Sequence, residues 1–184
     1  DNEFDMVEEL FEKSNEPVPQ QLATLKGKEP RFTRVSKKED MKQVVFDMFY
    51  RKNPDNGGFV VSAGLEQLIE YIQNLKFTEE DIDYLRSKGE FSEEFLNYLA
   101  NFKFTGNIDA LPEGTICYPN TPIVTVTAPV IEAQLIETML LLTINYQSLI
   151  ATKAARICRT ARDGGAIVME FGARRAHGAD AATL

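Results

Sequence analysis

The spacing of apolar residues changes several times along this chain, and each spacing predicts a different kind of element. Two runs rich in β-branched and aromatic side chains, at 44–50 and 59–61, flank a strong turn signal at 53–58 and predict two strands. Between Leu65 and Leu75, leucines and isoleucines recur at i, i+3, i+4 and i+7. This spacing predicts an amphipathic helix.

Two short helices are expected next, because two segments begin as helices typically begin. Phe77-Thr78-Glu79-Glu80 and Phe91-Ser92-Glu93-Glu94 each place a hydroxyl N-cap before two glutamates, after a phenylalanine at the position of a hydrophobic staple. Lys88-Gly89 is a suitable end for the first helix. These features account for helix stability and indicate no chemistry.

Strand periodicity returns over residues 104–129. Short apolar segments are separated by turns at 111–114 and 119–122, which predicts a small antiparallel sheet or a barrel sandwich. Lipoyl and biotinyl carrier domains have similar spacing, but they need a lysine at a hairpin tip. Because no lysine lies between Lys103 and Lys153, the pattern argues against a carrier domain.

A helical pattern of about thirty residues then runs from Val130 to Arg162, roughly 50 Å if unbroken, so we expect a kink or two consecutive helices. Asp163-Gly164-Gly165 ends it, because glycine suits a left-handed helix cap. The apolar run Ala166–Phe171 predicts a further strand. One helix face is expected to be apolar early and cationic late, through Ile131, Leu135, Thr138, Leu142, Tyr146, Leu149, Lys153 and Arg156.

Charge narrows the range of functions. The formal net charge of −8 argues against a nucleic-acid binder, which needs a basic surface. Basic side chains nevertheless gather late in the chain, and this distribution suits a small anionic ligand better than a polyanion. They are Lys153, Arg156, Arg159, Arg162, Arg174 and Arg175.

The cysteines and the apolar stretches bear on location. Cys117 and Cys158 are far apart in sequence and have no CxxC partner, which argues against structural zinc and fits a reducing cytosol. No signal peptide pattern is visible, and the most apolar stretch, 139–151, is too short to span a bilayer. We expect a soluble, cytoplasmic protein.

The adjacent Arg174 and Arg175 are the strongest functional signal. They follow the predicted strand at its C-terminal end, where βα architectures build ligand sites. Guanidinium groups bind carboxylate and phosphate in bidentate geometry, so an anionic ligand is the functional interpretation. Structural pairing with carboxylates is the alternative. Gly172 and Gly178 would let the chain leave the sheet, so that both arginines could reach one ligand.

These residues belong to a longer series of motifs that follow one another along the chain. Through this series, the segment from 44 to 180 resembles the N-terminal part of nicotinate phosphoribosyltransferase. The matching stretches are Val45–Arg51, Ala63–Glu66, Leu111–Gly114, Ala128–Pro129, Gln134–Thr138, Leu149–Arg156 and Glu170–Gly178.

The resemblance implies an enzyme of NAD salvage that joins nicotinate to 5-phosphoribosyl 1-diphosphate, with ATP hydrolysis coupled to the transfer. It implies an α+β N-terminal domain packed on an α/β barrel, a homodimer, and Mg²⁺ and ATP as cofactors. The expected organisation has four parts. Residues 1–40 form an extension or linker that does not match the family, 41–129 an N-terminal α+β domain, 130–162 a long connecting helix, and 163–184 the start of a truncated α/β barrel domain.

The resemblance also suggests roles for single residues. Arg174 and Arg175 would act as electrostatic clamps on the substrate, and Glu170 would orient an arginine or contact the ligand. His177, the only histidine, would line the site or serve the structure. Lys153 and Arg156 would either border the same cavity or form the solvated end of the helix.

Departures from the family set limits. A threonine–aspartate–leucine–tyrosine motif of the family has no counterpart in residues 1–43, Ala179 stands where proline is usual, and the rest of the barrel is missing. We therefore expect a fragment that is inactive alone. Two alternatives are open: a fragment of a quinolinate phosphoribosyltransferase-like enzyme, which Thr138 disfavours because an arginine is typical near it, and a non-catalytic module that dimerises through the long helix.

Overall fold

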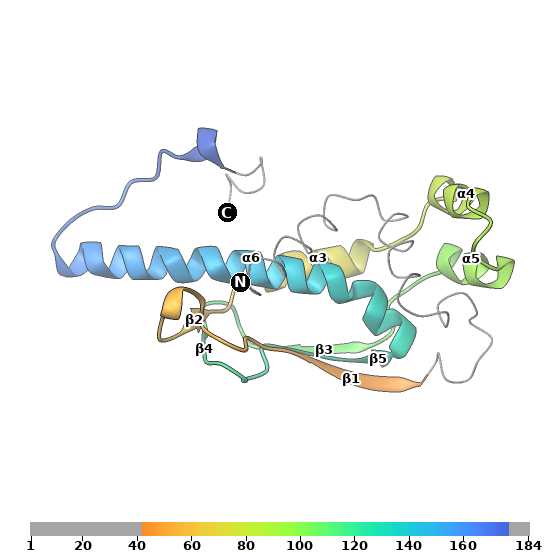
Figure 1. Ribbon diagram of the computed structural model, residues 1–184, viewed down its shortest axis with the longest axis horizontal. Helices are drawn as coiled ribbons and strands as arrows, with labels where there is room; N and C mark the ends of the chain where they lie inside the picture. The colour runs from red at the N-terminus through yellow and green to blue at the C-terminus, as the bar shows by residue number, and fades with distance from the viewer. Residues whose placement is uncertain (1–41, 177–184) are drawn as a thin grey trace.

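A computed structural model describes residues 42–176, so His177 and the predicted N-terminal extension lie outside the described residues. Strands, α-helices and two 3₁₀ turns (η) alternate irregularly along the chain (Figure 1). Their bounds are β1 (Gln43–Met48), η2 (Pro54–Asn56), β2 (Val60–Val61), α3 (Leu65–Asn74), α4 (Glu79–Ser87), α5 (Glu93–Ala100), β3 (Asn107–Ala110), β4 (Ile116–Cys117), β5 (Val124–Pro129), α6 (Val130–Asp163) and η3 (Ala173–Arg175).

The strands pair in antiparallel fashion, as the sequence predicted, and they form two small sheets. β5 lies between β1 and β3, and β2 pairs with β4. On β5 the alternate residues Val124, Val126 and Ala128 are buried, while Thr125 and Thr127 point to the other face. β1 and β2, which flank the turn at η2, therefore belong to different sheets.

Two apolar clusters build the interior. The larger one lies between α6, α3 and both sheets, with Leu68, Ile136 and Ile144 almost completely buried. The smaller one lies under α4 and α5, where Phe95 and Leu99 pack, and Ile131 of α6 joins it. Figure 1 shows α4 and α5 together at one end of α6, with the three-stranded sheet alongside the helix.

The short helices begin where their motifs predicted. The Thr78 hydroxyl accepts a hydrogen bond from the Asp81 backbone N–H, and the Asp81 carboxylate accepts from the Thr78 backbone N–H. The Ser92 hydroxyl accepts from Phe95 N–H in the same way. Both caps satisfy N–H groups that a helix start would otherwise leave unpaired.

Of the two forms expected for the long helix, the structure has the single helix with a bend. It runs from Val130 to Asp163, and its ribbon bends over the first turns (Figure 1). The face that is apolar early and cationic late is mostly half-buried, and Lys153 near its end is exposed. Small and polar side chains complete the face that packs inward, every fourth residue through Ile136, Leu140, Ile144, Ser148 and Thr152.

The predicted strand at Ala166–Phe171 is not formed. Gly165 adopts a left-handed φ of 68°, and hydrogen bonds from Gly165 N to Arg162 O and from Ala166 N to Ala161 O close the helix as a Schellman motif. The following residues are irregular, and Ile167 and Phe171 are 89% and 74% exposed. A strand needs a neighbour for its backbone groups, and this segment has none in the described part of the chain.

Candidate functional site

The two predicted clamp residues lie together on η3, beyond the segment that follows α6. Both arginines are exposed, and Arg174 Nη1 donates only to the backbone oxygen of Phe171, at 3.4 Å. The Glu170 carboxylate is also exposed, and it accepts a hydrogen bond from the Gly172 backbone N–H, not from an arginine. Both guanidinium groups are therefore available to an anion, but no enclosed site surrounds them in the described residues.

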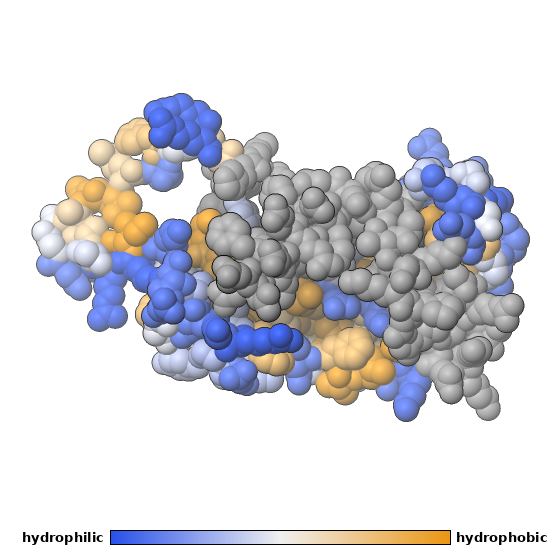
Figure 2. Space-filling view, viewed as in Figure 1, coloured by the Kyte–Doolittle hydropathy of each residue, from blue (hydrophilic) through white to orange (hydrophobic). Residues whose placement is uncertain are grey.

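Figure 2 shows the chemistry of this end of the molecule. The segment between α6 and η3 is coloured as hydrophobic, and η3 next to it is strongly hydrophilic. The exposed apolar side chains are Ile167, Val168, Met169 and Phe171.

Lys153 and Arg156 lie on the same helix but have different environments. Lys153 is exposed on α6, whereas Arg156 is half-buried and contacts the turn between β1 and β2. Its Nη2 donates to Pro54 O at 3.2 Å, and its Nη1 lies 3.5 Å from Asp55 Oδ2. The predicted site residues are therefore not brought together: the arginine pair, Lys153 and Arg156 have different surroundings.

A pair of helix hydroxyls that the sequence analysis missed holds β2 in place. Thr152 Oγ1 accepts from Val61 N–H at 2.8 Å, and Ser148 Oγ accepts from Ala63 N–H at 3.0 Å. The two hydroxyls are one turn apart on α6, and the two N–H groups are two residues apart on the strand side that faces away from β4. The signal in the sequence was the i, i+4 spacing of small hydroxyl residues within an apolar helix.

Glu113 is a second missed residue, and it lies at the start of α3. Its Oε1 accepts from Gly64 N–H at 2.9 Å and from Glu66 N–H at 3.3 Å. A carboxylate suits this position because of the exposed N–H groups and the positive end of the helix dipole. Gly64 itself has a φ of 100°, and a Cβ there would lie 2.8 Å from Thr143 O on α6. Glycine is required at this close approach.

A buried phenol lies beside the hydroxyl pair. Burial raises the pKa of Tyr50 to about 12, an effect that its neighbour Ser148 partly opposes. The Tyr50 oxygen has no partner with good hydrogen-bond geometry in the described residues, and the neighbouring Ser148 hydroxyl bonds to the Ala63 backbone. The thiol of Cys117 lies in the same region, and burial raises its pKa too.

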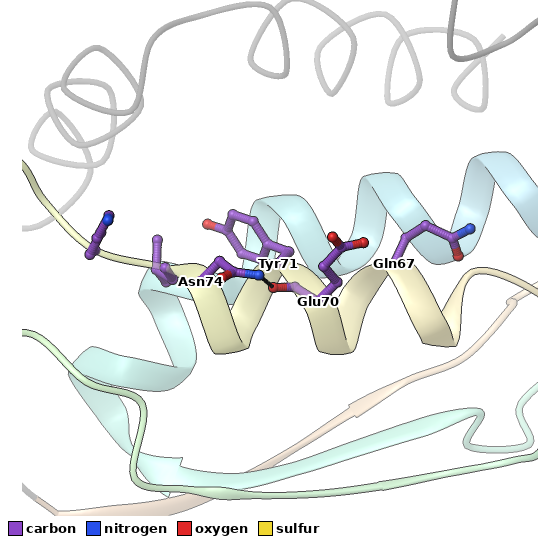
Figure 3. A pocket seen from close by; sticks show the side chains of 6 residues that line it. Gln67, Glu70, Tyr71 and Asn74 are labelled. Atoms are coloured by element: carbon purple, nitrogen blue, oxygen red, sulfur yellow. Dashed lines mark hydrogen bonds between the residues drawn. The ribbon is translucent and has the colours of Figure 1, made fainter.

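A surface hollow of about 420 Å³ lies along α3. Figure 3 shows its lining side chains along one face of that helix, with Asn74 donating to Glu70 O at 2.8 Å. Burial raises the pKa of Tyr71 to about 12. The hollow contains none of the predicted site residues, and its lining is Gln67, Glu70, Tyr71, Asn74, Leu75 and Lys76.

Comparison with known proteins decides the family. Residues 33–145 match the nicotinate phosphoribosyltransferase (NAPRTase) N-terminal domain. The chain belongs to this family. It is 50% identical over 138 residues to nicotinate phosphoribosyltransferase pncB2 of Mycobacterium tuberculosis, a match that covers 75% of this chain and 29% of the relative. It is 48% identical over 141 residues to the Bacillus subtilis nicotinate phosphoribosyltransferase, covering 77% and 28%.

The fold agrees with this assignment. The crystal structure of human nicotinic acid phosphoribosyltransferase superposes with a TM-score of 0.74 at 29% identity, covering 91% of this chain and 32% of that chain. The chain thus spans about three tenths of the length of the nicotinate phosphoribosyltransferases that it matches. A mixed α/β fold with small antiparallel sheets is confirmed, and the start of a barrel stays a prediction.

The contact between Glu113 and Gly64 lies within residues 33–145, which match the family. Thr152, which contacts β2, lies beyond that match. None of the helices in residues 42–176 is long and apolar enough to cross a membrane.

Proposed function

We propose that the complete gene product is a nicotinate phosphoribosyltransferase of NAD salvage. It would join nicotinate to 5-phosphoribosyl 1-diphosphate, releasing diphosphate, with ATP hydrolysis coupled to the transfer. The observation that carries this proposal is the match of residues 33–145 to the N-terminal domain of that family. The present chain would supply this domain and the residues at which the barrel begins, and would be inactive alone.

The chemistry assigns a limited task to this chain. Departure of diphosphate from a ribosyl carbon passes through a cationic, oxocarbenium-like state, so the protein mainly orients the nucleophile and balances anionic charge. Arg174 and Arg175 are suited to this task, because they are adjacent and exposed and their guanidinium groups bind anions in fixed geometry. Glu170, His177 and Lys153 are further candidates for binding the substrates.

The cofactors rest on the family resemblance. The described residues contain no group of three or more His, Cys, Asp and Glu side chains that could hold a metal ion. No step is therefore assigned to Mg²⁺ in this chain, and ATP has no binding motif here. The homodimer likewise rests on the resemblance, whereas the cytoplasmic location rests on the two isolated cysteines, which fit a reducing compartment.

Substitution of the arginine pair in the complete gene product tests the proposed role. Arg174→Gln and Arg175→Gln should each lower kcat/KM by a factor on the order of 10² or more. Each removes a positively charged donor that would balance the anionic charge of the substrate in the transition state. Steady-state release of diphosphate measures this. Arg162→Gln is the matched control, since Arg162 is an exposed arginine of α6. Unchanged kinetics in both pair variants would refute the clamp.

Two further measurements separate the alternatives. Nicotinate-dependent diphosphate release by the present 184 residues alone would refute the claim that they are inactive. Isothermal titration of the complete gene product should show tighter binding of nicotinate than of quinolinate. The reverse order would favour the quinolinate enzyme.

A further inference from the structure

Arg156 forms a long-range connection that the proposed reaction has not used. Its guanidinium reaches the turn around η2, about one hundred residues earlier in the sequence, with one donor on Pro54 O and another beside Asp55 Oδ2. The side chain is 30% exposed, against 79% for Arg159, the next arginine of the same helix. The sequence interpretation of Arg156 as a solvated helix end therefore does not describe its environment.

The turn is shaped to receive this guanidinium. A Cβ at Gly57 would lie 2.0 Å from Arg156 Nη2, so only a glycine leaves room for the side chain in its present place. Asp55 and Asn56 both adopt left-handed φ values, of 55° and 51°, a conformation that aspartate and asparagine tolerate better than other residues except glycine. The contacts of Arg156 with Pro54 O and Asp55 Oδ2 are made on this turn.

The contact lies near the C-terminal end of α6, beyond the buried part of the helix. Thr152 is the last buried side chain of the helix, and α6 continues for about 16 Å beyond it, over residues 153–163. Among the described residues, Arg156 is also the last α6 side chain with a hydrogen bond or ion pair to another element. The later pair, Arg159 with Asp163, lies within the helix.

The direction of the following segment depends on this end of the helix. The Schellman motif at Gly165 fixes how the chain leaves α6, and Arg174 and Arg175 come nine and ten residues later. Figure 1 shows the segment turning back at the free end of α6. A tilt of the last three helix turns would therefore move the point from which the arginine pair is presented.

We propose that Arg156 is a positioning residue for the anionic substrates: it holds the end of α6 against the β1–β2 turn and so fixes where Arg174 and Arg175 are presented. This inference rests on the proposed function. Arg156 itself is occupied by the turn and does not contact substrate.

Four variants of the complete gene product test it. Arg156→Gln removes the donors, and Arg156→Lys keeps the charge without the planar fork. Gly57→Ala displaces the guanidinium without changing any charge, at a backbone φ of −72° that alanine tolerates. Arg159→Gln is the control, with the same charge change on an exposed arginine of the same helix.

Steady-state kinetics and hydrogen exchange are the readouts. Arg156→Gln and Gly57→Ala should raise KM for nicotinate and for 5-phosphoribosyl 1-diphosphate by about tenfold to a hundredfold, since small misplacements of clamps have effects of this size. Arg156→Lys should restore part of the affinity. The Gly57 amide, which donates to Pro54 O at 2.9 Å, should exchange faster in Arg156→Gln than in Arg159→Gln.

The outcomes separate the two proposals. If the unsubstituted gene product is active and Arg156→Gln has the KM of Arg159→Gln, the positioning role is overturned and the proposed function stands. A loss of kcat in proportion to unfolded protein, with KM unchanged, also overturns it, because that is the mark of a purely structural residue. If the unsubstituted gene product shows no nicotinate-dependent turnover, both proposals fall. Gly57→Ala decides the question if Arg156→Gln does not fold.

Discussion

Two buried polar side chains of this domain, those of Glu132 and Tyr50, differ in whether they have hydrogen-bond partners. The carboxylate of Glu132 is 3% exposed, yet it accepts from both the N–H and the hydroxyl of Thr105, at 2.6 Å and 2.9 Å, in the first turn of α6. These donors and the helix dipole compensate for its burial. The Tyr50 hydroxyl, by contrast, is buried without a well-placed partner among the described residues.

Tyr50 therefore makes stability depend on alkaline pH. Its pKa is about 12 in the folded chain against 10.0 for an ordinary tyrosine, so the folded state retains the proton that the unfolded state loses. The stabilisation is complete below pH 10 and is lost as the pH rises from 10 towards 12. Tyr50→Phe should reduce this decline, as measured by urea unfolding at successive pH values.

Tyr118→Phe is the control for that experiment, because the Tyr118 side chain is 58% exposed. Burial also raises the pKa of Tyr71 and Tyr98 to about 12, so a smaller decline should remain in Tyr50→Phe. An identical pH profile for the wild-type chain and Tyr50→Phe would contradict the assignment.

At this scale, local signals could be predicted and distant ones could not. The caps at Thr78 and Ser92 depend on residues three positions away, so the sequence motif contains the whole interaction. The surroundings of Tyr50 depend on Ser148, and those of Arg156 depend on Pro54. No periodicity connects residues so far apart in sequence.

At the scale of elements, the contact between α6 and β2 unites the two layers. Ser148 and Thr152 replace the strand that would otherwise pair with the second side of β2. The Thr152 hydroxyl also donates to Ser148 O at 2.6 Å, so its proton has a partner as well. All of these groups are buried or half-buried, which makes an unpaired N–H costly.

Removal of either hydroxyl should lower the free energy of unfolding. Ser148→Ala leaves Ala63 N–H without its acceptor, and Thr152→Val does the same for Val61 N–H. Each should cost about 1–3 kcal/mol, measured by urea unfolding. Thr160→Val is the control, because the Thr160 hydroxyl donates only to Arg156 O in its own helix, and a change within about 0.5 kcal/mol is expected. Equal effects at all three positions would argue against the pairing.

The elements were predicted well where the pattern was strong and self-contained. The strands over 104–129 and the helix from Leu65 appeared as expected. The strand at Ala166–Phe171 did not, because an apolar run specifies only a tendency and the pairing partner must come from elsewhere. The inward face of α6 could not be predicted from hydropathy, because Ser148 and Thr152 count as polar in any such pattern, although the contact buries them.

At the scale of the molecule, the buried clusters occupy one part of the chain and the exposed apolar segment another. Ile144 of α6 is 1% exposed within the larger cluster. Met169 and Phe171, after the helix, are 72% and 74% exposed. Their hydrophobic area contributes little to the stability of the present fold.

Substitution in the present chain should reveal this division. The double variant Met169→Ser with Phe171→Ser should change the free energy of unfolding by less than about 0.5 kcal/mol, as at other exposed positions. Ile144→Ala should cost about 2–5 kcal/mol, because it leaves a cavity in the larger cluster. Thermal and urea unfolding measure both. A cooperative loss of stability in the double variant would mean that the segment packs on the domain.

The family could be predicted from ordered sequence blocks, and the match over residues 33–145 bears this out. The assembly of a site could not, because the arginine pair, Lys153 and Arg156 lie in different surroundings here. A substrate cavity depends on the walls around such residues, and the present chain spans about three tenths of the length of its relatives.

The helix hydroxyls beside β2 also have a consequence for aggregation. A bare strand edge is a template on which a foreign chain can add itself and begin a fibril. Along β2 and the residues just after it that template is blocked, because β4 occupies one flank and, on the other, the Thr152 and Ser148 oxygens accept from Val61 N–H and Ala63 N–H. Loss of both oxygens would thus expose unpaired N–H groups that could pair with another chain, and it would also destabilise the domain.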